Sequence, residues 1–205
     1  KIGSSLLTEG GSGRLRWDWL RDLVIDVIEL KKAGCDVLLV SSGAVALGQG
    51  HLGIRRSVLK LEEKQASAAV GQILLANAYT EVFGSHHLTV AQLLLTLGDT
   101  EGRRQYLNAR NTMETLLRLG AIPLINENDT VATQEIRFGD NDRLAARVAE
   151  MANADLLILL SDIDGLYTND PRLGTNSEHI PLVNEISAEI ESMAGPSRSN
   201  IGSGG

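Results

Sequence analysis

Short apolar runs of strand length alternate with longer helical patterns at least four times along this chain. The strand candidates are residues 37–40, 88–96, 121–125 and 156–160, and residues 1–5 look like the end of a further strand. Such alternation is the signature of a mainly parallel sheet enclosed by helices. We therefore predict an α/β fold, a three-layer αβα sandwich with a mainly parallel central sheet.

The first helical pattern has a clear apolar stripe, and the longest one does not. Apolar residues between Leu20 and Ile28 recur at helical spacing, and Gly34 is suited to end that helix. Residues 62–83 form an alanine-rich pattern long enough for about six turns. We expect the buried face of this second helix to consist of Ala66, Val70, Ile73, Leu74 and Ala78.

The remaining elements follow from glycine positions and local pattern. We expect a helix to start near Ala44, and another to cover residues 103–119 and to end at Gly120. Residues 140–151 should be helical, and residues 132–138 should form a small hairpin. Residues 156–160 read as a strand buried on both faces, because all five are leucine or isoleucine.

Length and composition fit one domain over residues 1–205, with no disulfide required. A domain of this size buries roughly 70% of the surface its unfolded chain exposes, and Cys35 is the single cysteine. The net charge of -7 argues against nucleic acid or anionic membrane as a partner, since either needs a positive face. No apolar run approaches 18 residues, so we expect a cytoplasmic protein without a membrane span.

Several strand candidates end in small or polar residues. Gly3, Ser42 and Ser161 each lie in such a group, and a dense polar cluster at residues 126–129 follows the apolar run 121–125. If the strands are parallel, these groups share one edge of the sheet. In open α/β sheets this edge is where ligands bind.

The residue types at this edge suggest anion binding and phosphoryl chemistry. Ser42, Gly43 and Ala44 open a helix and could hold a carboxylate or phosphate, although a serine there is more often only a helix cap. Lys1 could contact a phosphate or could be a solvated surface charge. Asp142 and Asp162 could orient a lysine or reach Mg2+ through water, but an aspartate at a helix start also stabilises the helix by itself.

Other nucleotide chemistries lack their motifs. The chain has no G-x-x-x-x-G-K-[ST] loop, no protein-kinase H-R-D or D-F-G motif, and no G-x-G-x-x-G after a strand. The sequence at residues 162–165 resembles part of a calcium loop but lacks the third acidic residue and the terminal glutamate. The four histidines have no metal-ligand spacing, so we assign no metal ligand in the chain.

Six short motifs stand at strand ends or glycine turns, at residues 1–5, 40–44, 126–129, 139–142, 160–167 and 202–205. In this order, and over essentially all 205 residues, they resemble the amino acid kinase family. The runs at residues 125–131 and 139–142 are similar to those of the members that phosphorylate glutamate. The resemblance implies transfer of the γ-phosphoryl group of ATP, with Mg2+, to the side-chain carboxylate of L-glutamate, the first step of proline synthesis.

The resemblance also implies roles for individual residues. Lys1 would neutralise charge on the transferring group, and Asp142 would organise the catalytic lysines. Two larger sets are expected to bind ligands. Glutamate would be bound by Ser42, Gly43, Ala44, Asn126, Asp129 and Asn141. The nucleotide would be bound by Lys1, Gly3, Ser161, Asp162, Tyr167, Gly202, Gly204 and Gly205.

The chain departs from the family pattern at its end. The family continues from the last glycines into a Thr-Lys pair whose lysine reaches ATP, and many members carry a C-terminal RNA-binding-like domain. We therefore expect a single kinase domain that is incomplete at both ends. The resemblance further implies a homo-oligomer and feedback inhibition by proline. Two alternatives remain open, a kinase for another acid or a nucleotide, and a non-catalytic nucleotide- or amino-acid-binding module.

Overall fold

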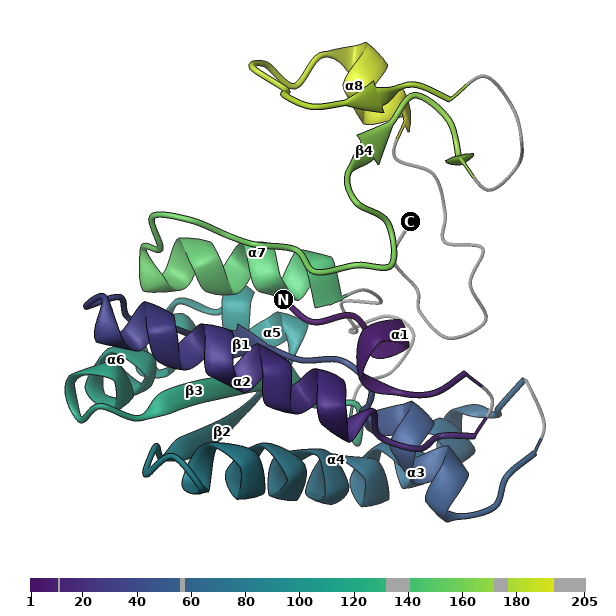
Figure 1. Cartoon of the computed structure of the whole chain (residues 1–205), viewed down its shortest axis with the longest axis vertical. Coiled ribbons are helices and arrows are strands. Elements are labelled where there is room, and N and C mark those ends of the chain that lie inside the picture. The colour runs from purple at the N-terminus through teal and green to yellow at the C-terminus, as the bar shows by residue number, and fades with distance from the viewer. Residues whose placement is uncertain (11, 56–57, 132–140, 172–176, 194–205) are drawn as a thin grey trace.

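The computed structural model describes residues 1–10, 12–55, 58–131, 141–171 and 177–193 (Figure 1). The predicted hairpin at residues 132–138, Asp140, and the glycines Gly202, Gly204 and Gly205 lie outside these residues. The elements follow in the order α1 (Ser4–Leu7), α2 (Trp17–Lys32), β1 (Leu39–Val40), α3 (Ala44–His51), α4 (Leu61–Gly84), β2 (Val90–Leu95), α5 (Leu97–Glu101), α6 (Arg103–Arg118), β3 (Ile122–Glu127), α7 (Asn141–Ala152), β4 (Leu166–Tyr167), β5 (His179–Ile180) and α8 (Ala188–Met193).

The central sheet is parallel, as predicted. Its three strands stand in the order β1-β3-β2, and both pairings are parallel. Ile2 adds two parallel bridges, one to Ser41 and one to Leu160. Residues 160 and 2 therefore extend the sheet beyond β1, and the carboxyl ends of all these segments meet at one edge.

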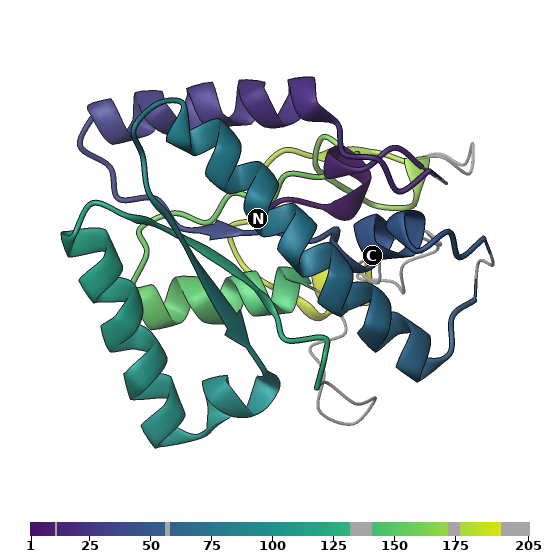
Figure 2. The same cartoon turned by 90° about the horizontal axis from the view of Figure 1, so that it is seen from below.

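Helices cover both faces of this sheet, which confirms the three-layer arrangement. On one face, α2 and α4 pack on one core cluster, to which β3 contributes Ile122 and Leu124. On the other face, α6 and α7 pack on a second cluster, which receives Ile125 from the same strand. This alternation is the period of two expected for a strand. Figure 2 shows α4 in front of the strands, and Figure 1 shows β4 and α8 projecting from one end of the sandwich.

Helices α3 and α4 cross at a distance that only glycine permits. A Cβ added to Gly48 would lie 1.8 Å from the carbonyl oxygen of Ser67, and one added to Gly71 would lie 1.7 Å from that of Ala44. The two backbones are therefore in direct contact. Because Ala44 is the first residue of α3, this crossing fixes α4 against the end of β1.

The buried face predicted for α4 is wrong. Ile73 is 64% exposed, and of the predicted set Ala78 alone is buried. Apart from Ala78, the buried residues of α4 are Ser67, Ala68, Gly71, Gln72, Leu75, Tyr79, Val82 and Phe83. The apolar residues of α4 occur on every side of the helix, so the sequence pattern does not indicate which side faces the core.

The run at residues 156–160 joins the sheet but is not buried. The backbone nitrogen of Lys1 donates to the carbonyl oxygen of Ile158 at 2.7 Å, and the N–H of Leu160 donates to that of Lys1 at 2.9 Å. Leu156 is nevertheless 74% exposed and Ile158 53% exposed. The prediction of a strand covered on both faces is therefore wrong. Within the described residues this run is the outermost segment of the sheet, and Leu160 alone of its five residues packs against a core cluster.

Candidate active site

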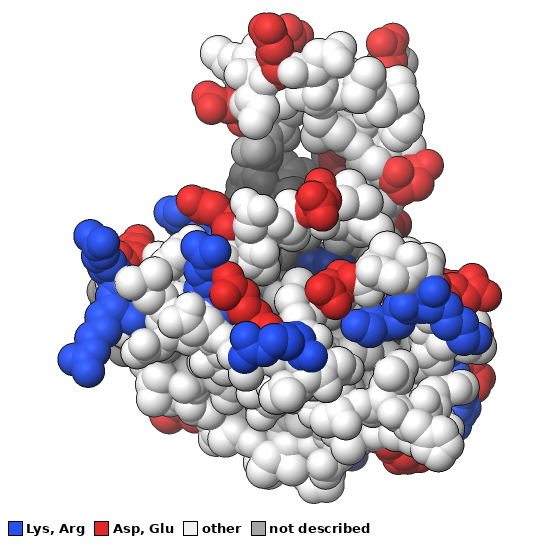
Figure 3. Space-filling model, turned by 90° about the vertical axis from the view of Figure 1, so that its left-hand side faces the viewer, with Lys and Arg blue, Asp and Glu red and all other residues white. Residues whose placement is uncertain are grey.

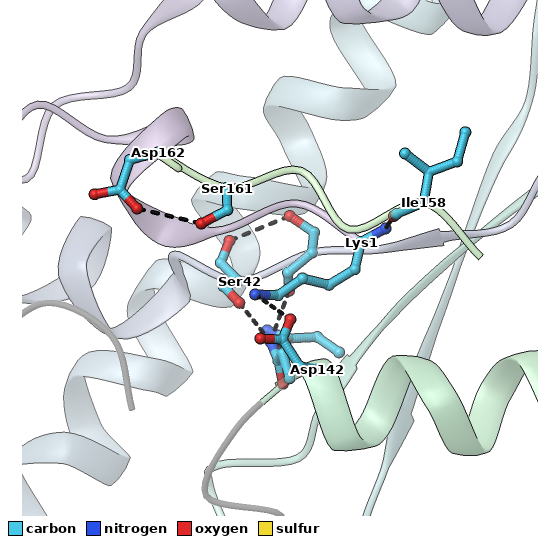
Figure 4. Close-up of polar contacts among 9 residues, drawn as sticks. Lys1, Ser42, Asp142, Ile158, Ser161 and Asp162 are labelled. Carbon is cyan, nitrogen blue, oxygen red and sulfur yellow. Dashed lines mark hydrogen bonds and ion pairs between the residues drawn. The ribbon is translucent and has the colours of Figure 1, made fainter. Parts of the chain in front are cut away.

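Side chains from four separate parts of the chain meet at the carboxyl edge of the sheet (Figure 4). Lys1 precedes the bridging residue Ile2, and Ser42 follows β1. Asn126 lies near the end of β3, and Asn141 is the first residue of α7. The strand pattern placed Ser42 and Asn126 at one edge, and the family resemblance added Lys1 and Asn141. The structure brings all four residues together.

An ion pair joins Lys1 to the start of α7. The Nζ atom of Lys1 lies 2.6 Å from Oδ1 of Asp142, and the side chains are 11% and 35% exposed, respectively. Asp142 occupies the first turn of α7, where the helix dipole favours a negative charge. The pair holds a nearly buried ammonium at the sheet edge, as the predicted roles of both residues require.

Beside this pair, amides and a hydroxyl form a connected cluster. Nδ2 of Asn141 donates to Oγ of Ser42 at 2.8 Å and to Oδ1 of Asn126 at 2.9 Å. Nδ2 of Asn126 donates to Oε1 of Gln72 at 2.8 Å. The cluster thus connects the end of β1, the end of β3, the start of α7 and the middle of α4.

The turn from β1 into α3 requires glycine at position 43. Gly43 has a φ of 106°, in the left-handed region, and it is the N-terminal cap residue of α3. Its conformation redirects the chain between Ser42 and Ala44, which places the free N–H groups of the first turn of α3 at the sheet edge. Such N–H groups can bind an anion.

Ser41, the residue before this turn, is held from beneath by α4. Its Oγ lies 3.0 Å from the hydroxyl of Tyr79 and donates to the carbonyl oxygen of Ser42 at 3.1 Å. Because the serine proton is used on the carbonyl, the tyrosine is the donor in the first contact. Burial raises the pKa of Tyr79, so its hydroxyl keeps this proton.

Three further predicted nucleotide-binding residues, Gly3, Ser161 and Asp162, lie on the segments of residues 1–3 and 160–162. The hydroxyl of Ser161 donates to Asp162 at 3.2 Å, and both residues are exposed and stand apart from the Lys1 ammonium (Figure 4). The N–H of Gly3 donates to the carbonyl oxygen of Leu160 at 3.3 Å. The backbones of residues 1–3 and 160–162 are therefore adjacent, whereas the side chains of Ser161 and Asp162 point away from the Lys1 ammonium.

Tyr167 and Asp129 are two further predicted site residues that the structure describes. Tyr167 lies on β4, and its hydroxyl donates to Asp164 at 2.8 Å. This hydrogen bond lowers the pKa of the Asp164 carboxyl and raises that of Tyr167. Asp129 lies in the turn after β3 and is half-buried.

Two residues that contact the cluster, Gln72 and Tyr79, were not predicted. Both lie on the buried side of α4, seven positions and thus two turns apart. The sequence signal was a glutamine and a tyrosine at helical spacing within an alanine-rich helix. That signal is weak because either residue is common on a helix surface.

The surrounding surface carries charges of both signs. On the face shown in Figure 3, Lys and Arg alternate with Asp and Glu across the middle of the molecule, and this face has no continuous basic surface. Among the residues that the structure describes, no group of three His, Cys, Asp or Glu side chains could hold a metal ion. No helix in the described part of the chain is long and apolar enough to cross a membrane.

Comparisons with known proteins agree with the geometry. A model described as the Amino acid kinase family matches residues 1–205. Proteins named Glutamate 5-kinase from Rhodopseudomonas palustris (strain BisB5), Paramagnetospirillum magneticum and Rhodospirillum rubrum are each 60% identical to this sequence over 205 residues. The matches cover 100% of the chain and 54%, 55% and 55% of these relatives, so the chain spans about half their length.

Proposed function

The chain belongs to the amino acid kinase family, and from this premise we propose that the protein is a glutamate 5-kinase. In this reaction an oxygen of the glutamate side-chain carboxylate forms a bond to the γ-phosphorus of ATP. The bond between that phosphorus and the β,γ-bridging oxygen breaks, and ADP leaves. The products are L-glutamyl 5-phosphate, an acyl phosphate used in proline biosynthesis, and ADP.

One observation carries this proposal most directly. Asn141 and Asp142 are consecutive residues at the start of α7, yet they contact different partners. Asn141 donates to Ser42 at 2.8 Å, whereas Asp142 holds the ammonium of Lys1 at 2.6 Å. A group suited to an amino acid substrate therefore adjoins a cation suited to a phosphoryl group. Phosphoryl transfer depends mainly on such alignment and charge stabilisation.

On the substrate side, the hydroxyl and amides would bind L-glutamate. Ser42 and Asn141 would contact its polar groups, and Asp129 would attract its ammonium. The left-handed turn at Gly43 directs backbone N–H groups near Ala44 toward the site, where they can donate to a carboxylate. Asn126 would hold Asn141 in place through the contact of 2.9 Å between them.

On the phosphate side, Lys1 would neutralise charge on the transferring group, and Asp142 would keep its ammonium in position. Gly3, Ser161, Asp162 and Tyr167 would border the nucleotide, together with Gly202, Gly204 and Gly205. Mg2+ would arrive bound to the ATP phosphates, since it commonly binds through one or two carboxylates plus substrate phosphates. The exposed carboxylate of Asp162 suits such a contact.

We extend the proposal to the biological setting. The protein would act in the cytoplasm as a homo-oligomer, and proline would inhibit it. These expectations follow from family membership. Gel filtration coupled to light scattering tests the homo-oligomer, and the effect of proline on turnover tests the inhibition.

A substrate panel tests the proposed activity. ADP release is measured on the intact protein with glutamate, aspartate, N-acetylglutamate and UMP, and hydroxylamine traps any acyl phosphate. We expect release and trapping with glutamate alone. Turnover with another member of the panel would instead indicate a related kinase. Binding of glutamate or ATP without turnover would indicate a binding module.

A further inference from the structure

Gln72 is a buried polar residue beneath the candidate active site. It lies in the middle of α4 and is 8% exposed. Its Oε1 accepts a hydrogen bond from Nδ2 of Asn126 at 2.8 Å, across 54 positions of sequence. Its own Nε2 is buried without a hydrogen-bond partner among the described residues. A buried amide N–H without an acceptor destabilises the fold, so stability alone does not account for glutamine here.

The orientation of the Asn126 amide is fixed by a backbone group. The N–H of Glu127 donates to Oδ1 of Asn126 at 2.9 Å, and a backbone N–H can only donate. The oxygen of Asn126 must therefore face Glu127, and its NH2 group must face Gln72. Gln72 in turn must present its oxygen rather than its nitrogen.

The same logic extends from Asn126 to the substrate side of the site. Oδ1 of Asn126 also accepts from Asn141, whose Nδ2 carries two protons. The second proton is directed at Oγ of Ser42 at 2.8 Å, which is closer than the remaining acceptor, the carbonyl oxygen of Ser41 at 3.4 Å. Since Ser42 accepts this bond, its own hydroxyl proton is available to donate. Asn141 keeps its oxygen as an acceptor.

We propose that Gln72 is a positioning residue that maintains the hydrogen-bond polarity of the glutamate site, by accepting from the Asn126 NH2 group that the Glu127 N–H orients. Through Asn126 and Asn141 it presents a donor at Ser42 and an acceptor at Asn141. A donor suits the carboxylate of an α-amino acid, and an acceptor suits its ammonium. Gln72 thereby supports a site that binds both the carboxylate and the ammonium of an amino acid. This inference rests on the proposed function for the identity of the substrate.

Three variants of α4 test the proposal. Gln72→Met keeps the approximate shape and removes the accepting oxygen, whereas Gln72→Glu keeps that oxygen. Ser67→Ala is the matched control, because Ser67 is a buried polar residue of the same helix whose Oγ has no hydrogen-bond partner among the described residues. The kinetic constants for glutamate and ATP and the melting temperature are measured for each variant in the intact protein.

Removal of the oxygen should weaken glutamate binding specifically. We expect Gln72→Met to raise KM for glutamate about 10-fold, the effect of losing roughly one hydrogen bond, with kcat and KM for ATP nearly unchanged. KM for glutamate in Gln72→Glu should stay within about 3-fold of the wild-type value. Ser67→Ala should have the same KM as the wild type. If the wild type is active and Gln72→Met leaves KM for glutamate unchanged, the proposal is overturned.

A second measurement separates this proposal from the proposed function. The side-chain amide signals of Asn141 are recorded by NMR without ligand. They should shift in Gln72→Met and not in Ser67→Ala, because Gln72 reaches Asn141 only through Asn126. A wild type that does not use glutamate would refute the kinase assignment alone. Unchanged Asn141 signals would refute the positioning role, whatever the substrate.

Discussion

The ammonium of Lys1 lies 2.6 Å from the carboxylate of Asp142, so the start of the described chain is tied to the first turn of α7. Lys1 also donates from its backbone nitrogen to Ile158, which places it between the sheet edge and that helix. The ion pair therefore holds Lys1 in one position before any ligand binds. Preorganised charge of this kind costs no rearrangement during the reaction.

Replacement of Lys1 by alanine should slow turnover more than it affects substrate binding. Loss of a group that stabilises transition-state charge typically lowers kcat by about 100- to 1000-fold. Lys31→Ala is a suitable control, because Lys31 pairs with Asp36 at 3.4 Å at the far end of α2. Steady-state ADP release compares the two variants. An unchanged kcat in Lys1→Ala would remove Lys1 from the mechanism.

Replacement of Asp129 by alanine should have the opposite kinetic signature. Asp129 is assigned to binding of the substrate ammonium, so its loss should raise KM for glutamate about 10-fold and change kcat little. Asp155→Ala, at an exposed position after α7, serves as the control. A fall in kcat without a change in KM would place Asp129 in the chemical step instead.

Tyr79 should make the stability of the fold depend on alkaline pH. Burial raises its pKa in the folded state, so the folded protein holds this proton more tightly than the unfolded chain. The contribution is complete below about pH 10, the unfolded-state pKa, and is lost as pH rises through the higher folded-state value. Urea unfolding at pH 7 and pH 10.5 should show a smaller loss of stability in Tyr79→Phe than in the wild type. Tyr106→Phe is the control, and equal losses in all three proteins would contradict the assignment.

Gly71→Ala should strongly destabilise the protein. Its new methyl group would lie 1.7 Å from the carbonyl oxygen of Ala44, so the helices must separate at a cost of about 3 kcal/mol or more. Gly84→Ala, at the end of the same helix, meets no atom within 4 Å and should be neutral or slightly stabilising. The free energy of unfolding measured in urea checks both. A neutral Gly71→Ala would mean that the close crossing does not constrain the fold.

The features that sequence analysis predicted well are local. Gly34 and Gly120 were expected to end helices, and both lie just beyond helix ends with φ values of 86° and 78°. The strands were found because buried parallel strands are continuous apolar runs. Their polar ends could then be assigned to one edge, since parallel strands share a direction.

The features that sequence analysis missed depend on contacts between distant residues. The buried side of α4 is set by its glycine contact with α3 and by Tyr79 and Phe83, not by a stripe of apolar residues. Residues 156–159 are exposed because their run is the outermost segment of the described sheet. An apolar run in the sequence does not reveal the order of the strands. The role of Gln72 depends on Asn126, 54 positions away, and no local pattern connects them.

The glycine crossing of α3 and α4 also has a mechanical consequence. With backbone against backbone at Gly48 and Gly71, neither helix can slide or rotate without a main-chain collision. Ser42, Gly43 and the hydrogen-bonding residues of α4 should therefore move as one stiff body. Any closure around a ligand must come from the opposing side, where α7 begins. The unit formed by α3, α4 and the turn at residues 42–43 is the fixed side of the site.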